Sequence, residues 1–313
     1  MTSVTNAESR TEQALGSPTG GATDVPAKKA SGEFLYFALR SKKFLVAMGI
    51  LFVLVAIAVF GPIIDGTDPL GQAGAAMQPP STDPGNWMGT TYLGEDVFAQ
   101  FANGLRATFF VGLLGGGLAA LIGMAVGFIA GYLGGWVDEI LNMVTNIFLV
   151  IPTLAVLLVI ASYLPSEWRG VPFEAIFIGL TSWPWAARAI RAQTFSLRSR
   201  DFVDLAKLSG RRGWKIIVTE IAPNMSSYLF LTFILLFGGA ILIGASLDFI
   251  GLGPHEGITL GLMMFYATTG AALNLGIWWW FIPPGIGIMA TVGALYVMNV
   301  GLDEIFNPKL RDI

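Results

Sequence analysis

The residues with the clearest potential for nucleotide chemistry form a short glycine-rich, basic run at positions 210–215. The run reads Gly-Arg-Arg-Gly-Trp-Lys. A Walker A loop needs the pattern G-x-x-x-x-G-K-[ST], in which backbone amides and a lysine surround the phosphates. The glycine spacing here is wrong, and no serine or threonine follows Lys215. We therefore expect no nucleotide cofactor in this chain, so that if ATP drives the protein, ATP and Mg²⁺ are bound by other subunits.

Cysteine and histidine chemistry is almost absent. The chain has no cysteine, which excludes disulfides, thiolate metal sites and cysteine nucleophiles. Its single histidine, His255, lies in the run Gly-Pro-His-Glu-Gly and is expected to be an ordinary loop residue. A membrane enzyme would need converging acid–base or metal-binding residues, and we expect neither an enzyme nor a metal site.

Four polar residues stand inside long apolar stretches and are the candidates for a translocation pathway: Asn142, Asn146, Asp248 and Asn299. Polar groups at membrane depth are costly unless they face partners or water. For the three asparagines we favour the alternative that they form hydrogen bonds between helices. Asp248, which we single out as the intramembrane acid, is as compatible with an interfacial position as with a pathway.

The long apolar stretches that contain these residues are typical of a membrane protein. Hydrophobic residues make up 54% of the chain and charged residues only 12%, whereas soluble proteins carry about 25% charged residues. Each apolar stretch is close to the ~20 residues that cross a bilayer. We predict an all-α polytopic fold with six spans, at about 44–64, 108–132, 140–162, 172–190, 226–250 and 279–301. In the fourth, Trp183-Pro184-Trp185 predicts a kink or an early exit.

The distribution of charge predicts the orientation. All but Arg106 and Arg169 of the 18 basic residues lie in the two terminal segments or in the loop 188–224. Because Lys and Arg collect on the cytoplasmic side, both termini and this loop are expected to be cytoplasmic. We divide the chain into a disordered tail (1–33), a first span with an external segment (34–103), the main transmembrane domain (104–303) and a C-terminal tail (304–313).

The loop between the fourth and fifth spans has a pattern that a solvated linker would not need. Val203, Ala206, Lys207 and Gly210 recur along one helical face, which is built largely of small residues and would let another surface come close. Gly210 suits a chain reversal at the helix end. A second helical stretch, 214–221, leads to a proline expected in the first turn of the next span. A plain basic loop held to anionic lipid is the alternative, but it explains only the arginines.

Two further features have simple interpretations. The second span contains the ridge Gly123, Gly127 and Gly131, which predicts close packing of helices. The run Trp278–Trp280 is expected to be interfacial, with stacking against a sugar ring as the less favoured alternative.

Four motifs resemble those of one transporter family. The order E-A-A, three residues, Gly, then Pro-Asn is similar to the coupling loop of bacterial ABC-importer permeases, and here it is carried by Asp204, Leu205, Ala206, Gly210, Pro223 and Asn224. Residues 89–97, 247–253 and 301–311 resemble G-T-D-x-x-G-R-D-V, L-S-F-L-G-L-G and the C-terminal tail of the "C" permease subunit of dipeptide/oligopeptide/nickel importers. This sequence departs from the pattern at Asp204, Leu205 and Glu220, which stand where relatives often carry Glu, Ala and His.

The resemblance implies a type I importer in a bacterial plasma membrane. Its partners would be a homologous second permease, two ATPase subunits and an external substrate-binding protein, with surrounding lipid and no nucleic acid. It places the contact with the ATPase at residues 201–224, with Lys207, Leu208 and Arg211 beside the motif residues. Peptides are the first choice of cargo, oligosaccharides such as β-glucosides the second, and nickel is less favoured. A proton-coupled carrier is the distant alternative.

Overall fold

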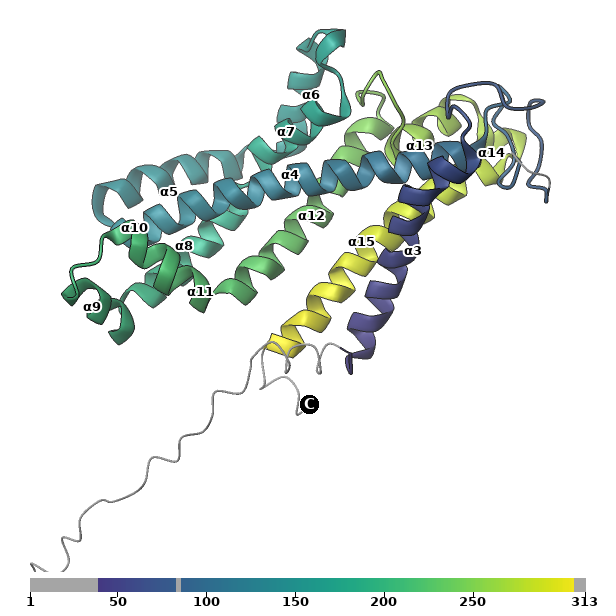
Figure 1. The fold of residues 1–313 in the computed structure, drawn as a ribbon. Helices are drawn as coiled ribbons and strands as arrows, with labels where there is room; N and C mark the ends of the chain where they lie inside the picture. The colour runs from purple at the N-terminus through teal and green to yellow at the C-terminus, as the bar shows by residue number, and fades with distance from the viewer. Residues whose placement is uncertain (1–38, 83–85, 307–313) are drawn as a thin grey trace, which may run out of the picture. The chain divides into compact units, whose positions relative to one another are not determined.

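The computed structural model describes residues 39–82 and 86–306, so the predicted tail 1–33 and most of 304–313 lie outside the described residues. Figure 1 shows that the described chain is helical. Its two β-bridges are isolated pairs in the segment between the first two long helices. The α-helices are α3 (Lys42–Asp65), α4 (Val97–Leu133), α5 (Gly135–Val150), α6 (Thr153–Tyr163), α7 (Val171–Ser182), α8 (Pro184–Arg198), α9 (Asp201–Leu208), α10 (Gly213–Ile216), α11 (Ala222–Asn224), α12 (Ser226–Phe249), α13 (Leu260–Thr269), α14 (Ala272–Leu275) and α15 (Trp278–Phe306); a 3₁₀ turn, η1 (Ser166–Trp168), and a π-helical turn, η2 (Ile217–Ile221), complete them.

The helix α4 is the longest of the described helices and the one that the others pack against. Its 37 residues rise about 55 Å, and it begins eleven residues before the predicted span 108–132. Asp96 caps its start by accepting hydrogen bonds from the amides of Phe98 (2.6 Å) and Ala99 (3.0 Å). Helices α3, α7, α8 and α12 lie along it (Figure 1). We call the end of α4 that lies beside α13 and α14 the α13 end, and the other the α9 end.

Glycines let two backbones approach α4 closely. A Cβ at Gly116 would lie 2.7 Å from the Cα of Phe237 in α12, and one at Gly127 would lie 2.8 Å from the carbonyl oxygen of Ala187 in α8. Side chains larger than hydrogen would therefore push these helices apart. The packing predicted for the glycine ridge of the second span is confirmed.

Two of the predicted spans are broken helices. The predicted span 140–162 divides into α5 and α6, which are bent by 78°. Ile151 takes an extended conformation because the ring of the following Pro152 disfavours helical geometry there. The predicted span 172–190 divides into α7 and α8 at Trp183, in front of Pro184, where the sequence predicts a kink or an early exit; Trp183 itself keeps helical dihedral angles (φ −69°, ψ −25°).

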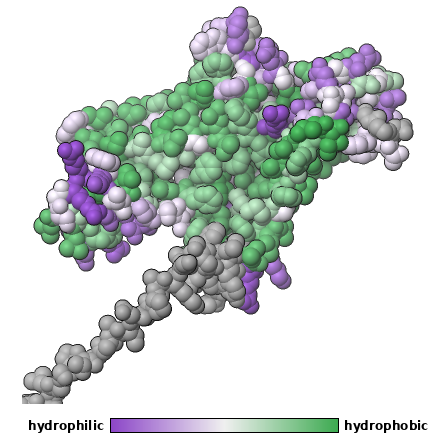
Figure 2. Space-filling view, in the orientation of Figure 1, coloured by the Kyte–Doolittle hydropathy of each residue, from purple (hydrophilic) through white to green (hydrophobic). Residues whose placement is uncertain are grey.

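The described residues include four helices that are long and apolar enough to cross a membrane, α3, α4, α12 and α15, or five when the bent pair α5–α6 counts as one span. Helix α7 has only 12 residues and falls short of the ~20 that a bilayer requires. Figure 2 shows apolar side chains over the middle of the described helices, with hydrophilic side chains gathered at α9–α10 and around α13–α14. This is a multi-pass membrane protein.

Candidate coupling site

The predicted docking helix exists as α9, Asp201–Leu208. Asp201 and Asp204 occupy its first turn and Lys207 its last, which suits the helix dipole at both ends. The Nζ atom of Lys207 lies 2.9 Å from Oδ1 of Asp204, three residues earlier on the same face. Both side chains are exposed, so this ion pair contributes little stability.

Gly210 ends α9 in the way that its sequence position predicts. Its φ of +71° lies in the left-handed region, which glycine adopts without steric cost. Its amide donates to the carbonyl of Lys207 (2.9 Å), and the amide of Arg211 donates to that of Ala206 (3.3 Å). These two bonds form a Schellman motif, and the chain reverses there.

The two faces of α9 have different surroundings. Val203 and Ala206 are buried in a core cluster with Ile190 of α8, Ile216 of α10 and Ile221 of η2. The small-residue face thus accepts another surface, but that surface belongs to the same chain. The opposite face carries Leu205 and Leu208, which are 64% and 85% exposed. Among the predicted contact residues within α9, these two leucines are the apolar ones available to a partner; Pro223, further along, is exposed too.

The returning arm fixes α9 against the rest of the bundle. It consists of α10, η2 and α11, and a Cβ at Gly213 would lie 2.8 Å from the Tyr132 ring at the end of α4. Arg211 forms an ion pair with Glu220, and the Asn224 side chain donates to the Glu220 carbonyl (2.6 Å). Pro223 lies in α11, which Met225 separates from α12. The helical stretch predicted at 214–221 is confirmed.

Basic side chains at the α9 end are partly engaged with α5. The Arg191 guanidinium pairs with Asp138, and Arg188 Nη2 donates to Asn146 Oδ1 at 2.5 Å. These contacts tie α8 to α5. The docking helix, α8 and the end of α4 therefore form one packed unit.

The four predicted pathway residues lie in different places. Asn142 and Asn146 border an open groove on α5, together with Glu139 and Val150. Asn299 of α15 donates to the carbonyl of Leu231 in α12 at 2.8 Å, which is the contact between helices that we favoured. Asp248 is buried at the end of α12, where it accepts a hydrogen bond from Thr259. The structure does not bring the four together.

Sequence reasoning missed a second buried acid. Glu174 lies within the predicted span 172–190 and is buried in α7, so the treatment of Asp248 as the lone intramembrane acid is wrong. The signal was available, because a glutamate inside an apolar stretch is costly wherever it occurs.

The interfacial position of Trp278–Trp280 stays a prediction, but two of the three side chains are engaged within the chain itself. Trp280 is fully buried and donates to Gln100 Oε1 (3.1 Å), while Trp279 donates to the carbonyl of Thr90 (3.1 Å). Gln100 in turn donates to Glu95, whose pKa is raised above its ordinary value by burial. These tryptophans hold the segment 66–96 to α4 and α15, so they are not free to stack on a sugar. Trp278 is exposed.

Comparison with known proteins decides the family. The family described as "Binding-protein-dependent transport system inner membrane component" matches residues 123–312, which include the whole of the coupling segment from α9 to α11. The chain belongs to this family.

Individual members of this inner membrane component family match most of the chain. A Brucella suis protein provisionally named a peptide transport system permease is 28% identical over 87% of this chain and 90% of its own length. A second B. suis protein, provisionally named a peptide permease, is 32% identical over 72% and 73%. The dipeptide transport system permease protein DppC of Bacillus subtilis is 29% identical over 87% and 84%.

Proposed function

We propose that this chain is one of two permease subunits of an ATP-driven peptide importer and that separate ATPase subunits act on it through α9. The observation that supports this proposal is that α9 exposes Leu205 and Leu208 on one face, while its opposite face is buried against the same chain. A helix whose apolar residues enter a groove is a common mode of recognition. Because Val203 and Ala206 join α9 to α8 and α4, a push on its leucines would be transmitted to the membrane helices.

The remaining partners follow from the same scheme. A homologous permease completes the pathway, a substrate-binding protein delivers cargo, and ATP with Mg²⁺ binds only to the two ATPase subunits. The positive-inside rule supports a cytoplasmic α9 end and cytoplasmic termini in a bacterial plasma membrane, since Lys207, Arg211, Arg212 and Lys215 surround α9. ATP binding can shift the permease between two states only if α9 makes different contacts in each.

Peptides are the proposed cargo. The names of the B. suis and B. subtilis relatives support this choice. The oligosaccharide alternative drew part of its support from the tryptophan run, and the burial of Trp280 weakens that part. Uptake of a labelled dipeptide by cells carrying the complete system, competed by unlabelled peptides and by a cello-oligosaccharide, tests the choice. Competition by the sugar alone would contradict it.

The role of α9 is tested by Leu208→Asp in the full chain, co-expressed with its partner subunits. A carboxylate at this exposed position should leave the fold intact but cannot enter an apolar groove. We expect a loss of about 2 kcal/mol or more, or roughly 30-fold weaker association with the ATPase subunits. Copurification of ATPase subunits and ATP-dependent uptake are the measurements.

The matched control is Leu273→Asp, because Leu273 is 64% exposed in α14 at the α13 end. This variant should retain its ATPase subunits. Undiminished copurification and uptake in Leu208→Asp would refute the docking role of α9 whatever the cargo proves to be.

A further inference from the structure

Two carboxyl groups lie buried where α7 packs on the last turns of α12. Glu174, in the first turn of α7, is 9% exposed, and Asp248, in the last turn of α12, is 1% exposed. Neither belongs to the coupling segment. Both stand in apolar elements, where an unpaired charge is expensive.

Three of their four carboxyl oxygens have no hydrogen-bond partner within the described chain: Oε1 and Oε2 of Glu174 and Oδ1 of Asp248. Oδ2 of Asp248 accepts from the Thr259 hydroxyl, which also caps the start of α13. Buried polar atoms are nearly always paired in native proteins. Three unpaired acceptors in one place therefore indicate a missing donor or cation.

Two glycines leave room for the two carboxyl groups, where a larger side chain would clash with them. A Cβ at Gly244 would lie 2.8 Å from Glu174 Oε1, and one at Gly253 would lie 2.3 Å from Asp248 Oδ1. Neither glycine has a left-handed φ, so it is room rather than backbone freedom that favours glycine here. Gly244 is one helical turn before Asp248 on the same face of α12, which brings the carboxyls together. Their charges act on one another.

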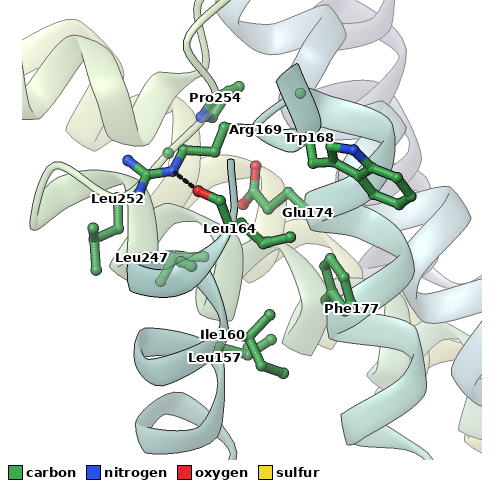
Figure 3. Close-up of a pocket in the computed structure, with 13 residues that line it drawn as sticks. Leu157, Ile160, Leu164, Trp168, Arg169, Glu174, Phe177, Leu247, Leu252 and Pro254 are labelled. Atoms are coloured by element: carbon green, nitrogen blue, oxygen red, sulfur yellow. Dashed lines mark hydrogen bonds between the residues drawn. The ribbon is translucent and has the colours of Figure 1, made fainter. Parts of the chain in front are cut away.

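A small cavity borders Glu174 (Figure 3). Its volume is about 30 Å³, and both Glu174 and Gly253 line it. The rest of the wall is mainly apolar, with Leu157, Leu164, Phe177 and Leu247 among the lining residues. Such a volume holds about two or three water molecules at most, because a single water needs about 10–15 Å³. A peptide or a hydrated ion does not fit.

Within the part of the chain that the structure describes, neither carboxyl forms an ion pair. Arg169 lines the same cavity, but its Nε donates to the Leu164 carbonyl (3.2 Å) and its Nη1 lies 3.3 Å from His255 Nε2. Two further ionisable groups lie on neighbouring segments: Glu256, which is exposed beside His255, and Tyr266 of α13, which the charge of Asp248 reaches.

We propose that Glu174 and Asp248 form a buried binding site for one small monovalent cation, either a proton or a dehydrated sodium ion. One positive charge reduces two negative charges to one and relieves the repulsion between α7 and α12. A proton would arrive as hydronium from the solvent, relayed through water in the cavity. It would form an O–H bond with one carboxyl oxygen and leave a neutral water behind. Ca²⁺ and Mg²⁺ are a poor match, since Ca²⁺ takes six to eight oxygen ligands and Mg²⁺ needs an octahedral shell.

The bound cation would stabilise the packing of α7, α12 and α13 against one another at their junction. When it leaves, two buried anions remain at the contact between α7 and α12, and their repulsion opposes the packing of the two helices. The stability of the junction should therefore depend on pH or on sodium concentration. The inference concerns this chain's own packing, so it does not depend on the cargo or on docking by α9.

The test uses the full-length chain, assembled with its partner subunits in lipid nanodiscs. Thermal midpoints are measured in one series from about pH 5.5 to about pH 8.5 at constant sodium, and in a second at constant pH with choline replacing sodium, because a ligand that binds only the folded state raises the midpoint. The wild type is compared with Glu174→Gln/Asp248→Asn and, as a matched control, with Glu256→Gln.

We expect the wild-type midpoint to fall by several degrees along one of the two series and the double variant to lose that dependence, while Glu256→Gln keeps it. A fall with rising pH, together with an infrared carbonyl band of a protonated carboxyl in the wild type, identifies the proton. A fall on sodium removal without that band identifies sodium. Equal slopes for wild type and double variant in both series, with no carboxyl band, overturn the proposal. The band is measured on wild-type protein and so does not depend on the variant's folding.

Discussion

At the scale of single residues, the coupling segment depends on backbone conformation as much as on side-chain chemistry. Gly210 closes α9 with a left-handed φ, and nothing lies within 4 Å of the position its Cβ would take. A larger residue would therefore be strained by its backbone but would meet no clash within the chain. This separates the effect of conformation from that of packing.

Replacing Gly210 by alanine should cost about 1–2 kcal/mol, because a left-handed φ brings Cβ close to the following carbonyl oxygen. The strain falls on the end of α9, so we expect weaker coupling between ATP hydrolysis and uptake, with the subunit still inserted. Gly210→Asn should retain most of the activity, since asparagine tolerates this conformation. The measurement is peptide uptake per ATP hydrolysed. Equal losses in both variants would contradict the conformational explanation.

At the scale of elements, α4 lets other helices pack closely against it because several of its residues are glycines, which have no side chain. Its glycines touch backbone atoms of α12 and α8, while Gly117, next to Gly116, has only the Phe233 ring at 4.0 Å from its Cβ position. Adjacent positions on one helix thus differ in whether a methyl group has room. The difference follows from which side of α4 faces α12.

Gly116→Ala should destabilise the protein by about 1–3 kcal/mol, as overpacking of a close contact does. Gly117→Ala should be neutral or stabilising by up to about 1 kcal/mol, because alanine is the better helix former. Thermal midpoints of the two purified variants measure the contrast. A midpoint for Gly117→Ala as low as that for Gly116→Ala would show that the contact with Phe237 is not what matters.

At the scale of the whole molecule, polar and charged residues gather at the two ends of α4. The α9 end holds the docking helix and its surrounding basic residues, and the α13 end holds the segment 66–96, fastened by Trp279 and Trp280. Between them lie the apolar helices and the buried acid pair. A transporter that receives cargo on one side and energy on the other needs such a division.

The absence of native cysteine makes the orientation directly measurable, because one introduced thiol is unique. Ser209→Cys, beside α9, should be protected from a membrane-impermeant maleimide in intact cells and labelled after permeabilisation. Leu273→Cys, at the α13 end, should be labelled in both conditions. The opposite pattern would place the basic end outside and would overturn the proposed direction of coupling.

The sequence by itself determined the class of the protein, the apolar stretches and the local shape of the coupling loop. Apolar runs, Gly210 and the Trp183-Pro184 break act through their immediate neighbours, and the information they carry is contained in a few consecutive residues.

Only the tertiary structure decided which side of each element is covered. It turned Val203 and Ala206 inward and left Leu205 and Leu208 exposed, it buried Trp280 against Gln100, and it brought Glu174 to the face of α12 that carries Asp248. The residues of each such contact lie far apart along the chain, so their meeting depends on how helices cross. That is fixed by the packing of the bundle as a whole.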